Sequence, residues 1–189
     1  MTRPTAMLLA PGSGTSCEHP SLVAIERALA PGLPVRRFDF EYRKAGKPFP
    51  DRAPKLIATT RAEAGALATE RGVAPDTLVL GGRSMGGRMC SMAVAEGLPA
   101  AGLVLICYPL HPPKKPDKLR VEHFADLSVP CLFVSGTKDE FGSPDEFDEH
   151  LARIPGPVTR VLVEGKRHDL KGADDQIIDA IRDWLATLS

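Results

Sequence analysis

The chain has 189 residues and a balanced charge, because 24 Lys and Arg residues are matched by 24 Asp and Glu residues. A nucleic-acid binder normally carries a basic excess, since phosphate contacts dominate its affinity, so no nucleic-acid partner is expected. A disordered chain is excluded as well, because 43% of the residues are hydrophobic. The length predicts one domain over residues 1–189, large enough to bury a core.

Cysteine spacing and apolar runs bear on the compartment. The four cysteines form no C-x-x-C pair, so a zinc ribbon is not expected and the thiols are predicted to be reduced and mostly buried. No segment approaches the ~18 apolar residues of a membrane helix, and the apolar run at residues 6–10 is too short for a signal peptide. We therefore expect a cytoplasmic protein without a membrane partner. The sequence does not predict its oligomeric state.

Short apolar runs rich in Val, Leu and Ile alternate with helical patterns. Buried strands are predicted at residues 6–10, 78–80, 103–107, 131–134 and 161–163. An alternating run at residues 35–42, with Phe38, Phe40 and Tyr42 on one face, predicts a further strand with one wetter face.

Helices are predicted between these strands, at residues 21–30, 54–71 and 85–96 and in a final stripe at residues 177–188. Another helix is expected to begin after Ser143, because Ser143, Pro144 and Glu146 form a capping-box pattern. This alternation predicts an α/β fold with a mostly parallel sheet of about six strands flanked by helices.

Residues 82–86 read Gly-Arg-Ser-Met-Gly and place Ser84 between a buried strand pattern and a helix pattern. That context is typical of a nucleophile elbow, in which a serine sits on a sharp turn with its hydroxyl exposed. Strand and helix approach closely at such a turn, so glycine is needed at positions 82 and 86. The segment predicts Ser84 as a nucleophile. The alternative is a glycine-rich turn with an incidental serine.

A nucleophilic serine needs a base, and in enzymes with such an elbow the acid and then the histidine follow the serine along the chain. His123, His150 and His168 follow Ser84 with acidic residues in between. His150 falls within a helix pattern, whereas His168 lies in a loop directly after a predicted strand at residues 159–164. We therefore predict His168 as the general base.

The acid that orients this base is expected just after the preceding strand. Asp139 lies there, past a turn at Gly136. Glu140 and Asp145 are nearby alternatives, although Asp145 is better explained as a first-turn residue that favours the helix dipole. Asp139 is the predicted acid.

An oxyanion needs backbone donors, and one should be the amide of Met85, which follows the nucleophile. The second is expected in the glycine-containing loop at residues 10–15, from Ser13 or Gly14, with Ser13 preferred. Two competing interpretations of the glycine-rich segments fail. The loop lacks the third glycine of a dinucleotide fingerprint, and residues 81–87 lack the Gly-Lys-Ser/Thr of a phosphate-binding P-loop.

Further candidates for substrate binding lie near these segments: Gly14, His19, Arg83 and His111. His19 equally fits a residue that precedes a helix start, and His111 a plain loop position. Arg83, beside the nucleophile, and Arg88, one helical turn on, have two interpretations: each either binds a substrate carboxylate or pairs with a surface acid. For Arg88 we prefer the pairing.

Together these segments resemble the α/β-hydrolase superfamily over nearly the whole chain. More narrowly, residues 81–88, 108–113 and 132–139 and the loop of Gly12, Gly14 and His19 resemble a small dienelactone-hydrolase-like branch. That branch includes testis-expressed protein 30 and the hydrolase-like domain of NSL-complex subunit 3. The resemblance implies a Ser84–His168–Asp139 triad, no metal and no cofactor. Lipase-type hydrolases insert a helical cap where this chain has only the proline-rich residues 109–129, so we expect no cap domain and an open site.

The sequence therefore predicts a serine hydrolase that cleaves carboxylic esters or thioesters of small soluble substrates through an acyl-enzyme. One alternative is a hydrolase-fold protein-interaction module without turnover, whose partner surface would include Lys114, Lys115, Lys118 and Arg120. A peptidase with the same triad is the other alternative.

Overall fold

The computed structural model describes residues 3–188, and over this range the strands form a six-stranded sheet in which all neighbours are parallel. The strand order is β2-β1-β3-β4-β5-β6. The strands are β1 (Ala6–Ala10), β2 (Val35–Arg37), β3 (Leu78–Arg83), β4 (Gly102–Ile106), β5 (Cys131–Gly136) and β6 (Val158–Val163). The predicted α/β fold with about six mostly parallel strands is confirmed.

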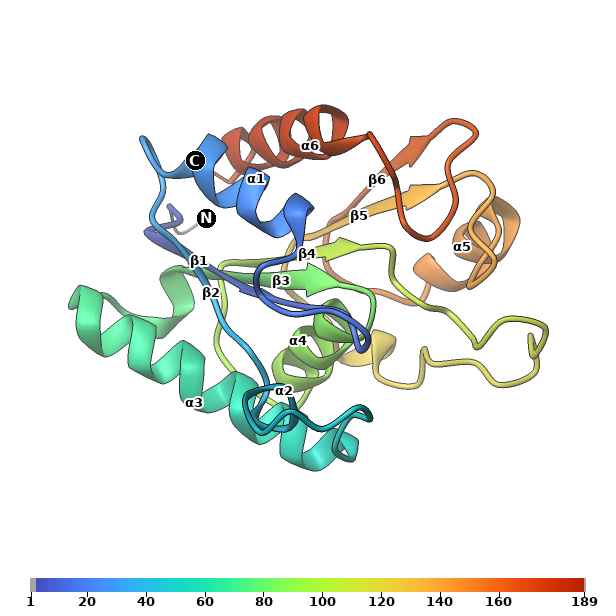
Figure 1. Ribbon diagram of the computed structural model, residues 1–189. Coiled ribbons are helices and arrows are strands. Elements are labelled where there is room, and N and C mark those ends of the chain that lie inside the picture. The colour runs from blue at the N-terminus through green and yellow to red at the C-terminus, as the bar shows by residue number, and fades with distance from the viewer. Residues whose placement is uncertain (1–2, 189) are drawn as a thin grey trace.

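Helices cover both faces of the sheet (Figure 1). Helices α1 (Pro20–Leu29) and α6 (Asp174–Ala186) pack on one face. The other face carries α2 (Glu41–Lys44), α3 (Ala53–Arg71), α4 (Met85–Ala95) and α5 (Pro144–Leu151). Two short 3-10 helices, η1 (Pro75–Thr77) and η2 (Phe124–Asp126), lie in connections. The four central strands, β1, β3, β4 and β5, are thus buried on both sides, as their continuous apolar runs require.

Local signals explain most of the helix boundaries. The Ser143 hydroxyl accepts from the Glu146 amide while the Glu146 carboxylate accepts from the Ser143 amide, which is the predicted capping box. Helix α3 ends at Gly72, whose φ of 63° lies in the left-handed region that favours glycine. These ends differ from the predicted ones by only a residue or two.

The predicted strand at residues 35–42 is wrong in its second half, because β2 ends at Arg37 and α2 begins at Glu41. The alternation had another cause. Phe38, Phe40 and Tyr42 are all buried and belong to one hydrophobic cluster on the α3 side of the sheet. Their rings contact each other in sequence, so burial of three aromatic side chains, and not strand pairing, sets the pattern.

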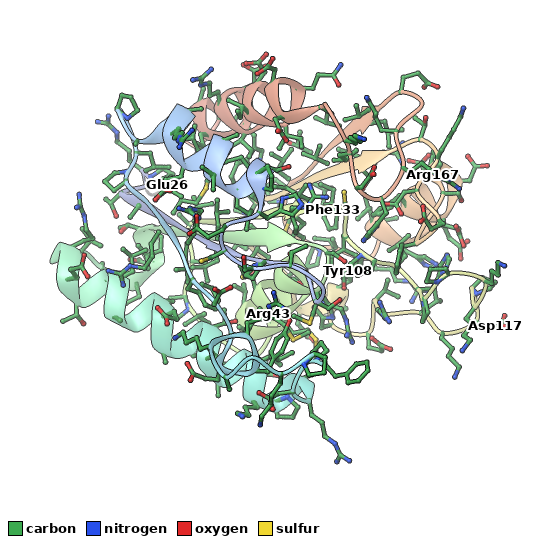
Figure 2. The ribbon with its side chains drawn as sticks, viewed as in Figure 1. Glu26, Arg43, Tyr108, Asp117, Phe133 and Arg167 are labelled. Atoms are coloured by element: carbon green, nitrogen blue, oxygen red, sulfur yellow. The ribbon has the colours of Figure 1, made fainter. Side chains whose placement is uncertain are left out.

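Residues 109–129, between β4 and β5, hold one helical element, the 3-10 helix η2, and otherwise only turns and irregular segments. Figure 2 shows Asp117 at the outer tip of this connection, while Tyr108 at its start lies inside the molecule. No helical cap is built there, in line with the sequence. Within residues 3–188, none of the helices is both long enough and apolar enough to cross a bilayer.

The turn between β3 and α4 gives a stability prediction. A Cβ atom at Gly86 would lie 2.4 Å from the Ala10 carbonyl oxygen and 2.5 Å from that of Pro11, and neither backbone group can rotate away. Gly86→Ala should therefore lower the free energy of unfolding by about 3 kcal/mol, the upper end of the usual cost of overpacking. Denaturant titration of the purified variant measures this change.

The matched control is Gly65→Ala, also within a helix, where a Cβ atom would meet nothing within 4 Å. Alanine is the better helix former, so this variant should be unchanged or up to about 1 kcal/mol more stable. Equal stabilities for the two variants would contradict the proposed close approach.

A buried contact under α4 gives a pH prediction. The His123 Nε2 atom lies 2.8 Å from the Ser91 hydroxyl, and burial, with help from the Arg88 charge, lowers the pKa of His123 to about 4. The unfolded chain protonates a histidine near pH ~6.5, so protons favour the unfolded state. The stability associated with His123 is therefore complete above that pH and is lost as pH falls toward 4. Between pH 7 and 4.5, the free energy of unfolding measured in urea should therefore fall less for His123→Gln than for wild type. If the free energies of unfolding of the two proteins change in parallel with pH, the contribution of His123 is ruled out.

Candidate active site

Ser84 sits on the turn between β3 and α4 in a strained backbone conformation. Its φ is 49° and its ψ is −118°, a combination that non-glycine residues rarely adopt. Its amide donates to the Ile106 carbonyl at the end of β4, at 2.8 Å. A Cβ atom at Gly82 would lie 2.2 Å from the Ala10 carbonyl oxygen, so the turn packs tightly against the end of β1. This packing holds the serine hydroxyl clear of the sheet.

The Ser84 hydroxyl is in line with a histidine and a carboxylate. Its Oγ atom lies 2.9 Å from His168 Nε2, and His168 Nδ1 lies 2.9 Å from both carboxylate oxygens of Asp139. A carboxylate only accepts hydrogen bonds, so Nδ1 must carry the hydrogen and Nε2 is left to accept the serine proton. The structure thus brings together the three residues that the sequence selected as nucleophile, base and acid.

Two adjacent strand ends deliver the acid and the base. Asp139 follows β5, and its side chain is fully buried, whereas the His168 side chain is 18% exposed. The loop after β6 lies against the end of β5, because a Cβ atom at Gly136 would be 2.1 Å from the Lys166 carbonyl oxygen. The Lys138 amide donates to that same oxygen at 2.8 Å. Both loops are therefore held at the carboxyl edge of the sheet, where such folds build their sites.

Phe141 also positions this pair, a role that sequence reasoning missed. Its ring stacks on the His168 imidazole with centroids 3.9 Å apart, and its amide donates to the Asp139 carboxylate at 2.9 Å. The only available signal was its position two residues after the acid.

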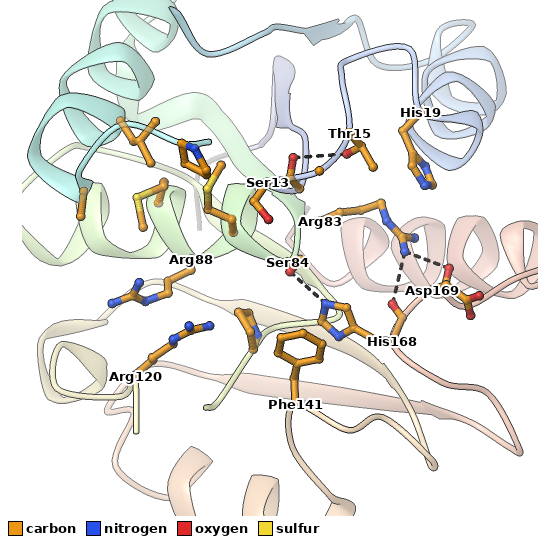
Figure 3. Close-up of a pocket in the computed structure, with 18 of the residues that line it drawn as sticks. Ser13, Thr15, His19, Arg83, Ser84, Arg88, Arg120, Phe141, His168 and Asp169 are labelled. Carbon is orange, nitrogen blue, oxygen red and sulfur yellow. Dashed lines mark hydrogen bonds between the residues drawn. The ribbon is translucent and has the colours of Figure 1, made fainter. Parts of the chain in front are cut away.

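Arg83 holds the loop of the base. Its guanidinium donates to the carbonyls of His168 and Asp169, at 3.3 and 2.8 Å, and its side chain is buried. The sequence proposed Arg83 for substrate binding; it does line the pocket, but its hydrogen bonds go to the protein. His19 lies beside it in Figure 3 and lines the pocket too. His19 also caps α1, since its Nδ1 accepts from the Ser21 amide at 3.2 Å.

The loop after β1 carries the second predicted amide. Ser13 and Gly14 line the same pocket as Met85, and a Cβ atom at Gly12 would lie 3.7 Å from that of Ser84. Met85 is the first residue of α4, so its amide has no intrahelical acceptor. The buried Tyr42 donates its hydroxyl hydrogen to the Ser13 carbonyl at 2.8 Å. Sequence reasoning missed this contact, which fixes the loop beside the nucleophile.

A cavity of about 880 Å³ opens over Ser84 and His168 (Figure 3). His111, the remaining candidate for substrate binding, is not among its lining residues. The His111 side chain is buried, with Nδ1 2.8 Å from the Pro112 carbonyl oxygen and Nε2 3.1 Å from a carboxylate oxygen of Glu146. It therefore joins the connection after β4 to the start of α5.

One cluster of possible metal ligands lies at this site. Cys107, Asp139 and His168 offer donor atoms within 4.8 Å of one another. Burial raises the pKa of the Cys107 thiol to about 12, so the thiol stays protonated and is a poor ligand. The cluster is explained by packing around the carboxylate and imidazole.

A family model described as "Alpha/beta hydrolase domain" matches residues 3–180. Several solved structures share the fold at low identity. Est1E from Butyrivibrio proteoclasticus is 14% identical with a TM-score of 0.77, covering 100% of this chain and 89% of that one. An alpha-beta serine hydrolase homologue from Coxiella burnetii is 18% identical, with a TM-score of 0.74 and coverages of 100% and 88%.

Dienelactone hydrolase from Anabaena variabilis is also 18% identical, with a TM-score of 0.72, and 98% of this chain and 87% of that chain are covered. At these identities the likeness concerns the fold. Because the family model spans residues 3–180, the chain belongs to the alpha/beta hydrolase domain family.

Proposed function

We propose that the protein is a serine hydrolase that cleaves carboxylic esters or thioesters of small substrates. The observation that carries this proposal is the unbroken line of contacts from the Ser84 hydroxyl through His168 to the buried Asp139 carboxylate, at the floor of an open cavity. A strained serine on an elbow has no structural use of its own, which favours a chemical role.

The reaction follows from this geometry. The Ser84 Oγ attacks the acyl carbon as its proton passes to His168 Nε2, and Asp139 stabilises the imidazolium. The amides of Met85 and Ser13 donate to the oxyanion. Collapse of the tetrahedral intermediate breaks the bond to the alcohol or thiol, which leaves with the proton from Nε2. A water molecule then attacks the acyl-enzyme while Nε2 takes its proton, and the returning proton restores the Ser84 hydroxyl.

The open site favours small or flexible substrates. Among residues 3–188 no helical cap covers the cavity, so little apolar surface is available to enclose a long acyl chain. Est1E, one of the structures with the same fold, holds ferulic acid in a second solved form. We also propose that the chain belongs to the small dienelactone-hydrolase-like branch, because its sequence at residues 81–88 and 108–113 resembles that branch. Four free cysteines, three of them buried, accord with a cytoplasmic enzyme.

The nucleophile can be tested with a fluorophosphonate probe and intact-mass spectrometry. Wild type should gain one adduct, whereas Ser84→Ala should gain none and lose ester hydrolysis by about 10³-fold or more. Ser16→Ala is the control, because Ser16 lies outside the cavity and should label as wild type does. An adduct on Ser84→Ala, or undiminished hydrolysis by it, refutes the role of Ser84. Esters, thioesters and peptides assayed side by side separate the esterase from a peptidase.

The acid can be tested by a pair of conservative substitutions. Asp139→Asn keeps the shape of the side chain but favours the wrong imidazole tautomer, so kcat should fall by about 10⁴-fold. Glu140→Gln, at the neighbouring exposed position, should retain activity within about threefold. Steady-state kinetics on one ester measures both. A larger loss from Glu140→Gln than from Asp139→Asn would assign the acid to Glu140.

A further inference from the structure

Two half-buried arginines line the cavity without an ion-pair partner. Arg88, on α4, and Arg120, in the connection after β4, are both half-buried and both face the cavity that contains Ser84. Among residues 3–188, neither guanidinium forms an ion pair. The Nε atom of Arg88 is buried and has no hydrogen-bond acceptor. This contradicts the preferred sequence interpretation, in which Arg88 pairs with a surface acid.

Six other arginines have partners within residues 3–188. Arg83 donates to backbone carbonyls, and five more arginines pair with carboxylates: Arg36, Arg37, Arg61, Arg160 and Arg182. Acidic groups do lie around the cavity, but none pairs with Arg88 or Arg120. These groups are Asp51, Glu140 and Asp169 in the lining and the exposed Glu122 beside Arg120. Arg167 also lines the cavity without an ion pair, but its side chain is exposed to solvent. Among residues 3–188, Arg88 and Arg120 are therefore the half-buried arginines of the lining that lack a partner.

Leaving these groups unpaired costs free energy. Burial, and next the charge of Arg88, lowers the pKa of Arg120, so the two cations lie close enough to repel each other. A buried N–H without an acceptor adds a desolvation cost. A planar guanidinium pair with free donors matches the oxygens of a carboxylate or phosphate, which would relieve both costs at once.

Hydrogen bonds fix the backbone of both arginines before any ligand arrives. Arg88 lies within α4, and its amide donates to the Ser84 carbonyl at 3.1 Å. Arg120 is fixed at two points, because its amide donates to the Leu110 carbonyl at 2.8 Å and its carbonyl accepts from the buried Tyr108 hydroxyl at 2.6 Å. Such preorganisation is typical of a binding site.

The position of the pair relative to Ser84 indicates which end of a substrate it meets. Arg88 is one helical turn, about 6 Å of rise, from Ser84 along α4. In Figure 3 the two guanidinium groups lie on one side of Ser84 and the imidazole of His168 lies on the other. His168 must reach the leaving group to protonate it. The acyl chain therefore extends toward the arginines.

We infer that the cavity is selective for esters or thioesters whose acyl chain ends in an anionic group, a carboxylate or a phosphate, which Arg88 and Arg120 bind together. This inference rests on the proposed hydrolase function. It adds the chemical class of the acyl group.

The test compares matched substrates. Mono-para-nitrophenyl esters of succinate, glutarate and adipate are assayed beside the same esters with the free carboxylate methylated, and a para-nitrophenyl phosphonopropionate represents the phosphate arm. For at least one chain length, kcat/KM for the anionic ester should exceed that of its neutral partner by about 10- to 100-fold. The anionic group that gives the larger preference, carboxylate or phosphonate, identifies the ligand. If neither anionic substrate is preferred over its neutral partner, the inference is overturned.

Substitutions then test whether the preference for the anionic ester depends on Arg88 and Arg120. Arg88→Gln and Arg120→Gln should each remove about 10-fold or more of kcat/KM for the anionic ester while leaving the neutral ester within about threefold. Arg120→Lys should retain only part of the kcat/KM for the anionic ester, because an ammonium group cannot donate two parallel hydrogen bonds to one anion as a guanidinium does. Arg153→Gln, which removes an exposed charge outside the cavity, should change neither ester. Equal losses for both esters would mean a structural role and would overturn the inference. If Arg88→Gln does not fold, Arg120→Gln decides.

Two further arms separate this inference from the hydrolase proposal. A butyrate ester of a hydroxybenzoate carries its carboxylate on the leaving group. Its kcat/KM should not exceed that of the methylated ester in a way that depends on Arg88 or Arg120, and a preference of equal size would overturn the placement of the anion on the acyl side.

Calorimetry of Ser84→Ala with free glutarate and with inorganic phosphate reports binding without turnover. Binding of either anion that Arg120→Gln abolishes supports the site even if no ester is cleaved. Turnover of neutral and anionic esters at equal rates leaves the hydrolase standing and removes the anion site.

Discussion

The active site depends on the contact between the β3–α4 turn and the end of β1. Ideal Cβ atoms at Gly82 and Gly86 would lie 2.2 and 2.4 Å from the same acceptor, the Ala10 carbonyl oxygen. Because that oxygen belongs to the backbone of a central strand, it cannot yield. The loop of Gly12 lies beside the same contact, since a Cβ atom at Gly12 would touch that of Ser84, so one packing constraint sets the positions of the nucleophile and of the amides proposed for the oxyanion.

The sequence predicts most of the fold and much of the candidate site, for a physical reason. Buried parallel strands read as short apolar runs, and their carboxyl ends meet at one edge, so chain order alone brings Ser84, Asp139 and His168 near each other. Each of the three residues follows a strand closely. Only local signals were needed to find them.

The features that sequence did not predict depend on contacts between distant segments. Arg83 donates to a carbonyl 86 residues away, and Tyr42 to one 29 residues away, and no pattern near either residue announces this. The run at residues 35–42 misled for a related reason. Three buried rings produced the period of a strand, although two of them lie in an irregular segment and the third in a short helix.

A neutral chain leaves substrate selection to local charge. With 24 basic and 24 acidic residues the molecule has no net charge to steer a ligand from a distance, and salt screens exposed charges over about 8–10 Å. Salt screens the charges of the half-buried Arg88 and Arg120 less. These charges therefore act strongly, but only on a group that has already entered the cavity. The proline-rich connection matters here, since it forms no cap yet delivers Arg120 through its hydrogen bond to Tyr108. Selection would then come from a fixed pair of cations at the acyl end, in place of the enclosing surface that a cap provides.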